Sequence, residues 1–458
     1  MKTHNNKDDI LKNVKHVHMI GIGGSGMCPL AEILHTKGYI VTGSDNNIGD
    51  PLKRVQALGV KAYLGHAAEN VGDAELVVYS AAISSDNPEL VEAHRRGIPT
   101  MERAELLGAV TRHYNNVIGV CGTHGKTTVT SMITQILYLN DFDPTAVIGG
   151  YLPLINANGR AGKTEYMVCE ACEYVDTFLH ISPDITVLLN IDNDHLEYFK
   201  TMDNLTNSFH KFVAMGRQCF VNGDDTRCRT AVSGIDGGVT TFGFSDSNDY
   251  YPRNITPGKR GMCFDIFNNG EKLCSLALSL PGKHNVLNAL AAFSVAHSLG
   301  ICSSSIVNAI EGFTGAGRRF EFVCEKNGIT FADDYAHHPT EITATLTAAK
   351  TLQYNNVIVV FQPFTFSRTA MLKDDFIKAL ENADKVILTP IMGSREVNTY
   401  GISSEQLAEK LDNCTTVADF SEAERVIFDI AKPGDLVITM GGGDIYKVSH
   451  AIRDGITL

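Results

Sequence analysis

Short apolar runs that end near glycine alternate with segments of helical spacing along most of this 458-residue chain. Strand-like runs begin near residues 16, 39 and 74, and MCPLAEILHTKG, between the first two, has helical spacing and ends in glycine. A second series includes NVIGV, EYMVCEA and DITVLLNID, and a third includes NVIVVFQ, DKVILTPI and GDLVITMGGGD. This alternation predicts βαβ units, and therefore an α/β fold of parallel sheets with helices on both faces.

Chain length and two polar linkers predict the domain organisation. A chain of 458 residues is long for a single hydrophobic core, which favours about three domains. The segments TRHYNN near Thr111 and FTGAGRRFE near Gly315 are the candidate boundaries. We therefore expect three consecutive α/β domains, over residues 1–112, 113–316 and 317–458.

Composition excludes several classes of protein. The net charge of −13 argues against a broad basic face for nucleic acid. The first residues, MKTHNNKDDILKN, are polar, and the chain has no apolar run of 18 residues, so we expect neither a signal peptide nor a membrane span. The 11 cysteines are odd in number and scattered, which favours free thiols in a reducing cytoplasm.

A first glycine loop, HMIGIGGSGM, follows a predicted strand and opens a predicted helix. Gly21, Gly23 and Gly26 have GxGxxG spacing, which permits a tight turn and close approach of a diphosphate to a helix N-terminus. Asp45 ends the next strand, where an acid that binds ribose is expected. The motif is stronger evidence for a diphosphate group in the ligand than for a nicotinamide. An NAD-dependent oxidoreductase is therefore one of the functions that the loop allows.

A second glycine loop, GTHGKTT, follows the strand-like run that ends at Val120. It departs from the usual phosphate-loop pattern, because Val120 stands where that pattern has its first glycine. The shortened loop keeps the chemistry: Gly122 and Gly125 free the backbone amides, Lys126 would reach the β- and γ-phosphates, and Thr127 would ligate Mg²⁺. We therefore predict a nucleotide site.

Two residues that follow neighbouring strands support this nucleotide site. Glu170 ends EYMVCE, and His195 follows ITVLLNI. Because parallel strands end at the same edge of a sheet, both side chains could meet near Thr127 and hold a divalent ion. We predict Thr127, Glu170 and His195 as the metal-binding residues, for Mg²⁺ or Mn²⁺.

The motifs together resemble the Mur ligases of bacterial cell-wall synthesis. GTHGKTT is similar to the GTxGKTT signature of that family, EACEYVD to its EADESD, and NIDNDHLEYF to its NIxxDHLD. PGKHNVLNALAA, GAGRRFE, DDYAHHPTEI and FQPFTFSRT also match, in order and across nearly the whole chain. Within the family, HMIGIGGSGM and DDYAHHPTE are most similar to the branch that adds the first amino acid.

The resemblance implies a Rossmann-like N-terminal domain, a central ATPase domain of the phosphate-loop type and a Rossmann-like C-terminal domain. It assigns the first loop to UDP instead of NAD. The implied activity joins L-alanine to the lactyl carboxylate of UDP-N-acetylmuramate, through an acyl phosphate made with ATP. We expect no nucleic-acid or membrane partner, and a monomer or weak dimer.

The resemblance also implies site residues. Those for the UDP-sugar are Gly21, Gly23, Gly24, Ser25, Gly26, Ser44, Asp45 and Ser80. Those for ATP are Gly122, Thr123, His124, Gly125, Lys126, Thr127, Thr128, Asn285, Asn288, Arg318 and Asp333. Those for the amino acid are Tyr335, His337 and Arg368, and the catalytic set is Lys126, Glu170, His195 and His337.

Several of these residues have a second interpretation. Asn285 also suits the capped start of a buried helix, and Arg318 also suits a salt bridge. His337 is our choice for taking a proton from the amine, and His338, before a proline, is the structural histidine. The Arg368 guanidinium would pair with the α-carboxylate of alanine.

The chain departs from the family pattern at two places. Phe364 and Thr365 stand where the family often has His and Arg, which leaves Arg368 as the basic residue of that stretch. Cys172 replaces an Asp, while Glu170 and Glu173 are kept.

Two alternatives to alanine addition are a recycling ligase that attaches a whole peptide and a nucleotide-dependent regulator.

Overall fold

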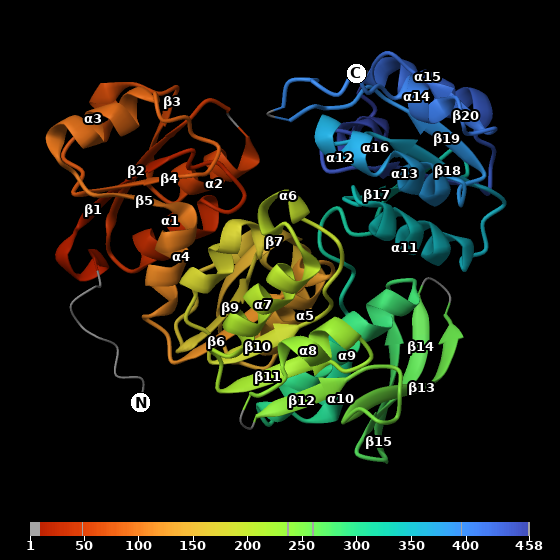
Figure 1. The fold of residues 1–458 in the computed structure, drawn as a ribbon, viewed down its shortest axis with the longest axis horizontal. Helices are drawn as coiled ribbons and strands as arrows, with labels where there is room; N and C mark the ends of the chain where they lie inside the picture. The colour runs from red at the N-terminus through yellow and green to blue at the C-terminus, as the bar shows by residue number, and fades with distance from the viewer. Residues whose placement is uncertain (1–9, 48, 236–237, 259–260, 395, 457–458) are drawn as a thin grey trace. The chain divides into compact units, whose positions relative to one another are not determined.

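The computed structural model describes residues 10–47, 49–235, 238–258, 261–394 and 396–456 (Figure 1). Its internal contacts divide the chain into two compact units. The first contains the chain up to Arg253 together with Ile266–Cys274 and Leu287–Ile310, and the second contains Asn254–Asp265, Ser275–Val286 and Glu311–Leu458. No helix among the described residues is long and apolar enough to cross a membrane.

The first unit begins with a five-stranded, all-parallel sheet in the order β3-β2-β1-β4-β5. This is the strand order of a Rossmann-like half, with the crossover point at β1. The elements are η1 (Ile10–Asn13), β1 (His16–Ile20), α1 (Cys28–Thr36), β2 (Ile40–Asp45), α2 (Asp50–Ala57), β3 (Lys61–Leu64), η2 (Ala68–Val71), β4 (Leu76–Tyr79), α3 (Pro88–Arg96), β5 (Thr100–Glu102) and α4 (Arg103–Thr111).

Both faces of this sheet are buried, and the alternation of side chains along β1 shows how. Val17 and Met19 belong to a large core that includes residues of α1, α2 and α4. Ile20 belongs to a smaller core formed with α3 and the end of η2. His18, between Val17 and Met19 on the strand, is fully buried and faces Glu89 of α3.

Helix α3 has a complete set of local boundary signals. The Asn87 side chain accepts hydrogen bonds from the amides of Glu89 and Leu90, and Pro88 occupies the first turn. Gly97 ends the helix in the left-handed conformation, with φ of 68°. These signals place Glu89 in the first turn, and its contact with His18 of β1 shows that it faces the sheet.

The remainder of the first unit is built around part of a second, ten-stranded sheet, in which seven strands follow the order β12-β11-β10-β6-β9-β7-β8. The pairs among these seven strands are parallel except for β7 with β8. The elements are β6 (Asn116–Cys121), α5 (Lys126–Leu139), β7 (Thr145–Leu152), η3 (Pro153–Ile155), β8 (Ala157–Arg160), β9 (Tyr166–Glu170), η4 (Tyr174–His180), β10 (Ile185–Leu188), α6 (Leu196–Phe199), α7 (Met202–Val213), β11 (Gln218–Asn222), α8 (Thr226–Ala231) and β12 (Val239–Phe242).

The two sheets of the first unit are joined by close packing. A Cβ added at Gly108 of α4 would lie 2.3 Å from the carbonyl oxygen of His180, and one at Gly159 of β8 would lie 2.5 Å from Pro29. The Asn158 side chain of β8 donates a 2.8 Å hydrogen bond to the carbonyl of Ser25 in the first glycine loop. The core also continues from one sheet to the other, so this part of the chain packs as one body.

The boundary between the units passes through the segments that follow β12. These are β13 (Tyr250–Pro257), β14 (Met262–Asn268), β15 (Glu271–Leu278), α9 (Lys283–Ser298) and α10 (Ser303–Glu311). In the first unit, Tyr250 of β13 pairs with Phe242 of β12, and the phenol of Tyr250 hydrogen-bonds His297 of α9 at 2.8 Å.

The second unit has a six-stranded sheet in the order β16-β17-β21-β18-β19-β20, parallel except for β16 with β17. Helices α11, α13 and α14 share one core with the sheet, and α15 and α16 share the other. The elements are β16 (Glu321–Lys326), β17 (Ile329–Asp334), α11 (Pro339–Lys350), β18 (Val357–Phe361), α12 (Phe366–Met371), α13 (Lys373–Leu380), β19 (Lys385–Leu388), α14 (Glu405–Ala408), β20 (Cys414–Thr416), α15 (Phe420–Ile430), β21 (Leu436–Met440) and α16 (Tyr446–Asp454).

The predicted α/β class, with helices on both faces of largely parallel sheets, is confirmed. The β7–β8 and β16–β17 pairs are antiparallel, which the alternation of strand-like and helical segments does not predict.

Candidate active site

The second glycine loop connects β6 to α5 and adopts a conformation that requires glycine. Gly122 has φ of 132° and Gly125 has φ of 86°. A Cβ at Gly125 would lie 2.6 Å from the side-chain oxygen of Asn288, so that α9 residue packs directly against the loop. The structure therefore brings Asn288 to the predicted nucleotide loop.

Lys126 is the first residue of α5, and its ammonium group bridges the loop. It donates to the carbonyls of Gly122 at 2.6 Å and Thr123 at 3.0 Å, and to both carboxylate oxygens of Glu173 at 3.0 and 3.2 Å. Burial alone would lower the pKa of Lys126, but the neighbouring carboxylates, above all Glu173, outweigh burial and raise it. The lysine therefore stays charged, as a group that neutralises phosphate must.

Thr127 and Glu170 lie together as predicted for a metal site. The Thr127 hydroxyl donates a 2.9 Å hydrogen bond to Oε2 of Glu170, which also accepts the amide of Gly149 of β7 at 2.8 Å. A hydroxyl and a carboxylate are hard oxygen donors of the kind that Mg²⁺ prefers, so this pair fits the ion that the sequence implies.

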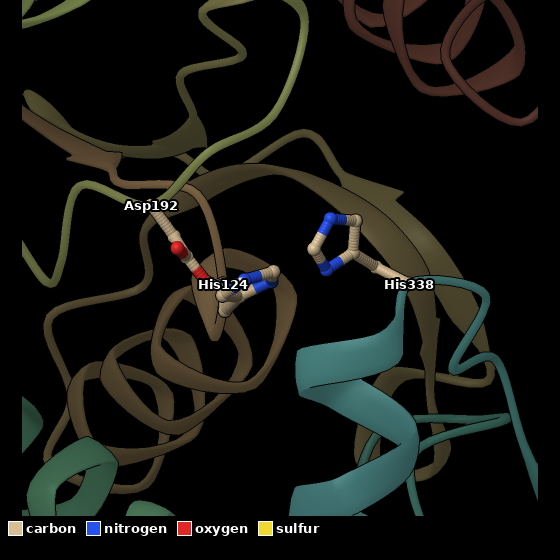
Figure 2. A group of neighbouring side chains, drawn as sticks. All are labelled: His124, Asp192 and His338. Carbon is tan, nitrogen blue, oxygen red and sulfur yellow. Dashed lines mark hydrogen bonds and ion pairs between the residues drawn. The ribbon is translucent and has the colours of Figure 1, made fainter. Parts of the chain in front are cut away.

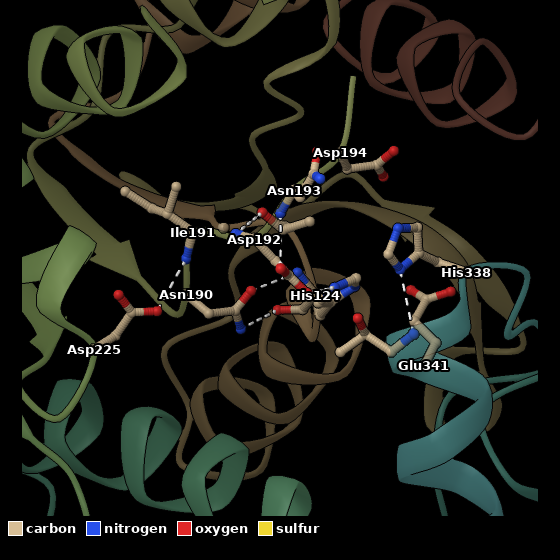
Figure 3. A network of polar contacts seen from close by, with 12 residues as sticks. His124, Asn190, Ile191, Asp192, Asn193, Asp194, Asp225, His338 and Glu341 are labelled. Atoms are coloured by element: carbon tan, nitrogen blue, oxygen red, sulfur yellow. Dashed lines mark hydrogen bonds and ion pairs between the residues drawn. The ribbon is translucent and has the colours of Figure 1, made fainter. Parts of the chain in front are cut away.

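The loop is fastened to the end of β10 by Asn190 and Asp192. The Asn190 side chain accepts the amide of His124 at 2.8 Å and donates to the carbonyl of the same residue at 3.0 Å (Figure 3). The amide of Asp192 donates to the Thr123 hydroxyl at 2.9 Å. Figure 2 shows the Asp192 carboxylate facing the His124 ring, with Oδ2 3.2 Å from Nε2.

His195 has a strained backbone, with φ of 58°, at the start of α6. Its ring packs against Tyr174 with centroids 4.8 Å apart, and its nitrogens lie 3.6 Å from Asp194 and 3.5 Å from Glu197. Such a conformation costs about 1–3 kcal/mol and is concentrated at functional sites. The role of His195 at a metal or substrate carboxylate stays a prediction.

The first glycine loop is supported by the end of β2. The Ser44 carbonyl accepts the amides of Gly21 at 2.8 Å and Ile22 at 3.1 Å, and the Asp45 carboxylate accepts the amide of Gly23 at 3.0 Å. A Cβ at Gly21 would lie 3.2 Å from the Ser80 hydroxyl oxygen. Ser44, Asp45 and Ser80 therefore surround this loop, as expected of residues at one diphosphate site.

In the second unit, Arg318 and Asp333 form an ion pair. Nε of Arg318 lies 2.9 Å from Oδ2 of Asp333, which is fully buried, and Nη2 donates to the carbonyl of Gly441 at 2.6 Å. The guanidinium also stacks over Tyr335 and Tyr446. The salt-bridge interpretation of Arg318 is thus observed, and its reach to ATP stays a prediction.

His337 lies among aromatic and charged groups. Its Nδ1 is 3.0 Å from the carbonyl of Tyr335 and 3.4 Å from Glu341, and its ring packs against Tyr335 and Phe364. Burial lowers its pKa, opposed by Glu341 and reinforced by Arg368. The neutral imidazole that a general base requires is therefore favoured.

The two departures near the amino-acid segment have local explanations. The Thr365 hydroxyl accepts the amide of Arg368 at 3.3 Å and caps α12. Phe364 packs on the His337 ring. His338 caps α11 through its side chain, in keeping with its structural assignment.

Two functional candidates were not proposed from the sequence. Glu173 is nearly fully buried and pairs with Lys126, and Asn190 clamps the loop. Asn190 closely follows the apolar strand β10, which is the signal that points to Glu170 and His195 as well, whereas Glu173 lies three residues beyond the end of β9. Asn285 donates to the carbonyl of Pro281 at 2.8 Å, which supports its interpretation as a residue that stabilises the start of α9.

Three successive segments of the chain match three domains of one known family. Residues 16–115 match the Mur ligase family catalytic domain, residues 120–296 the Mur ligase middle domain, and residues 318–443 the Mur ligase glutamate ligase domain. The chain belongs to the Mur ligase family. The three-domain Mur ligase architecture expected from the motifs is thereby confirmed, while the exact domain boundaries stay a prediction.

Individual Mur ligases resemble the chain over nearly its full length. UDP-N-acetylmuramate–L-alanine ligase of Clostridium botulinum (strain Loch Maree / Type A3) is 43% identical over 451 residues, which cover 97% of this chain and 98% of that protein. The crystal structure of UDP-N-acetylmuramate-alanine ligase MurC from Thermotoga maritima has a TM-score of 0.83 at 29% identity, and covers 96% and 99% of the two chains. A murein peptide ligase from Psychrobacter arcticus has a TM-score of 0.75 at 25% identity, covering 96% and 99%.

Proposed function

We propose that this chain is an ATP-dependent ligase that joins L-alanine to the lactyl carboxylate of UDP-N-acetylmuramate, in the synthesis of peptidoglycan precursors. The observation that carries the proposal is the near-full-length match to the clostridial L-alanine ligase. The two glycine loops support it, because the reaction needs one site for a UDP diphosphate and another for the phosphates of ATP.

Phosphoryl transfer is the first step. The lactyl carboxylate attacks the γ-phosphorus of ATP, the bond to the β–γ bridging oxygen breaks, and ADP leaves the acyl phosphate. This chemistry requires mainly positioning and neutralised charge. Lys126 would stabilise the transferring phosphoryl group, Asn288 would lie at the nucleotide, and Thr127 and Glu170 would hold Mg²⁺, which would neutralise phosphate charge.

Amide formation is the second step. The amine of L-alanine attacks the activated carbonyl, and inorganic phosphate leaves with the electrons of the C–O bond. His337 takes a proton from the ammonium group, so that a lone pair becomes available. Arg368 pairs with the α-carboxylate of alanine, and Tyr335 lines the same position.

A recycling ligase is the second candidate, favoured by the likeness to the Psychrobacter murein peptide ligase. A phosphate-release assay with UDP-N-acetylmuramate, ATP and either L-alanine or the cell-wall tripeptide separates the two. We expect release with L-alanine, and release with the tripeptide alone would replace the proposal by the recycling activity.

A Lys126→Ala variant tests the role of the second loop. We expect ADP formation to be abolished, while calorimetry shows UDP-N-acetylmuramate binding close to that of the unchanged protein. Lys350→Ala, at an exposed position in the last turn of α11, is the matched control. Normal turnover by a folded Lys126→Ala protein would remove Lys126 from the mechanism.

A further inference from the structure

Glu89 is a fully buried carboxylate in the first turn of α3, outside the sites assigned above. Its Oε1 accepts hydrogen bonds from the side chain of Asn70 at 2.6 Å and the amide of Ala67 at 3.2 Å. Its Oε2 accepts from the Ser44 hydroxyl at 2.5 Å. The Nε2 of His18 and the Nδ1 of His66 lie 3.5 Å from the same oxygen.

These hydrogen bonds make the carboxylate an anion. Burial alone would raise the pKa of Glu89, but the contacts of His18, Ser44 and Asn70 outweigh burial and lower the pKa to about 2. The N-terminus of α3 adds a favourable helix dipole. A buried anion held in this way fixes its neighbours strongly, because hydrogen bonds to a charged group are about twice as strong as neutral ones.

The groups that Glu89 fixes come from two segments far apart in the chain. Ser44 is at the end of β2, and Ala67 and Asn70 belong to the segment that follows β3. The hydroxyl proton of Ser44 is committed to Glu89, so its oxygen accepts from Nδ1 of His66 at 2.9 Å. This arrangement fixes the ring tautomer of His66, whose side chain is 13% exposed.

Ser44 connects this cluster to the first glycine loop. While its side chain donates to Glu89, its carbonyl accepts the amides of Gly21 and Ile22. Gly43 is equally constrained, because an added Cβ would lie 2.5 Å from the carbonyl oxygen of Met19. The end of β2 is therefore held on both sides, and a displacement of the Ser44 side chain would also move the carbonyl that accepts the two loop amides.

We propose that Glu89 is a positioning residue of the UDP-sugar site, which holds Ser44 and the segment from His66 to Asn70 in register with the first glycine loop. It acts through these groups and does not touch the substrate. The inference rests on the proposed function, which assigns the first loop to UDP.

A Glu89→Gln variant tests the inference at nearly constant volume. Both oxygens of Glu89 accept hydrogen bonds from neighbouring donors. The glutamine side chain would place its NH₂ group, which is itself a donor, against the donors on one side, so the hydrogen bonds on that side would be lost. Calorimetry on the full chain with UDP as the probe should show affinity weakened about 10-fold or more. The KM for UDP-N-acetylmuramate should rise similarly, with ATP affinity unchanged and kcat within about 2-fold.

The matched control is Glu92→Gln on the same helix. Glu92 pairs with Arg95, whose side chain is 70% exposed, so this variant should keep the UDP affinity of the unchanged protein. Asn70→Ala removes one hydrogen bond to Glu89 and should weaken UDP binding less than Glu89→Gln does. It also keeps the inference testable if Glu89→Gln does not fold.

Two outcomes would overturn the inference. One is unchanged UDP affinity in a folded Glu89→Gln protein, or in Asn70→Ala if the first variant does not fold. The other is an equal loss of UDP and ATP binding, which indicates a general structural role. Failure of the unchanged protein to bind UDP would instead refute the proposed function.

Discussion

Replacing Glu173 by glutamine tests the buried ion pair with Lys126. The side chains of Glu173 and Lys126 are only 2% and 14% exposed. At 3.0 Å and an effective dielectric constant of about 20, the attraction between the charges is about 5.5 kcal/mol. Removing one partner leaves a buried, uncompensated charge, so we expect the free energy of unfolding to fall by about 3–5 kcal/mol.

Urea unfolding measures this loss. The chain has no tryptophan, so far-UV circular dichroism and tyrosine fluorescence are the probes, and coincident transitions would justify a two-state treatment. Asp246→Asn is the control, because the Asp246–Arg253 pair is 67% and 43% exposed and should contribute only about 0–1 kcal/mol.

A double-mutant cycle separates the ion pair from other effects of the substitution. In Lys126→Met combined with Glu173→Gln neither charge remains, so the double variant should lose at least about 2 kcal/mol less than the sum of the single losses. The reasoning is refuted if Glu173→Gln loses no more than Asp246→Asn, or if the single losses simply add.

Three further predictions concern the loop, the amino-acid segment and pH. Gly125→Ala should lower the free energy of unfolding by about 2–4 kcal/mol and weaken ATP binding, because the added Cβ would meet Asn288. Gly38→Ala is the control in the same denaturation assay. Gly38 has φ of 90° but open space around it, so this variant should show only the backbone strain of about 1–2 kcal/mol. Arg368→Ala should raise the KM for L-alanine about 10-fold or more with little change for ATP, and an unchanged KM would remove Arg368 from the site. Burial raises the pKa of Asp334 from 3.8 to about 6, opposed by Arg319 and two backbone amides, so the folded state binds more protons than the unfolded state between these values. Stability should therefore fall as pH rises through this range, and Asp334→Asn should flatten the profile measured by calorimetry.

Much of the fold could be predicted because its signals are local. The strand-like runs near residues 16, 39 and 74 correspond to β1, β2 and β4, and the helical segment before Gly38 corresponds to α1. The antiparallel β7–β8 pair was not anticipated, because strand direction depends on how distant backbone segments meet.

The candidate site was predicted unevenly for the same reason. Thr127 and Glu170 were expected to meet because both follow strands of one parallel sheet, and the structure has them hydrogen-bonded. Glu173 gave no separate signal, because it lies in the irregular segment between the end of β9 at Glu170 and the start of η4 at Tyr174, where no periodic pattern places a side chain.

The order of apolar and polar residues determined the class of fold, and the spacing of the glycines predicted the two loops and the phosphate groups that they would bind. Periodicity and loop composition act over a few residues and are therefore written in the chain. Only the tertiary structure decided which carboxylate contacts which partner. Glu170 accepts a hydrogen bond from Thr127, Glu173 forms an ion pair with Lys126, and Glu89 accepts a hydrogen bond from Ser44, which is 45 residues away in the sequence. Such pairings follow from strand register and burial, where each unpaired charge would be costly, so no local pattern reports them.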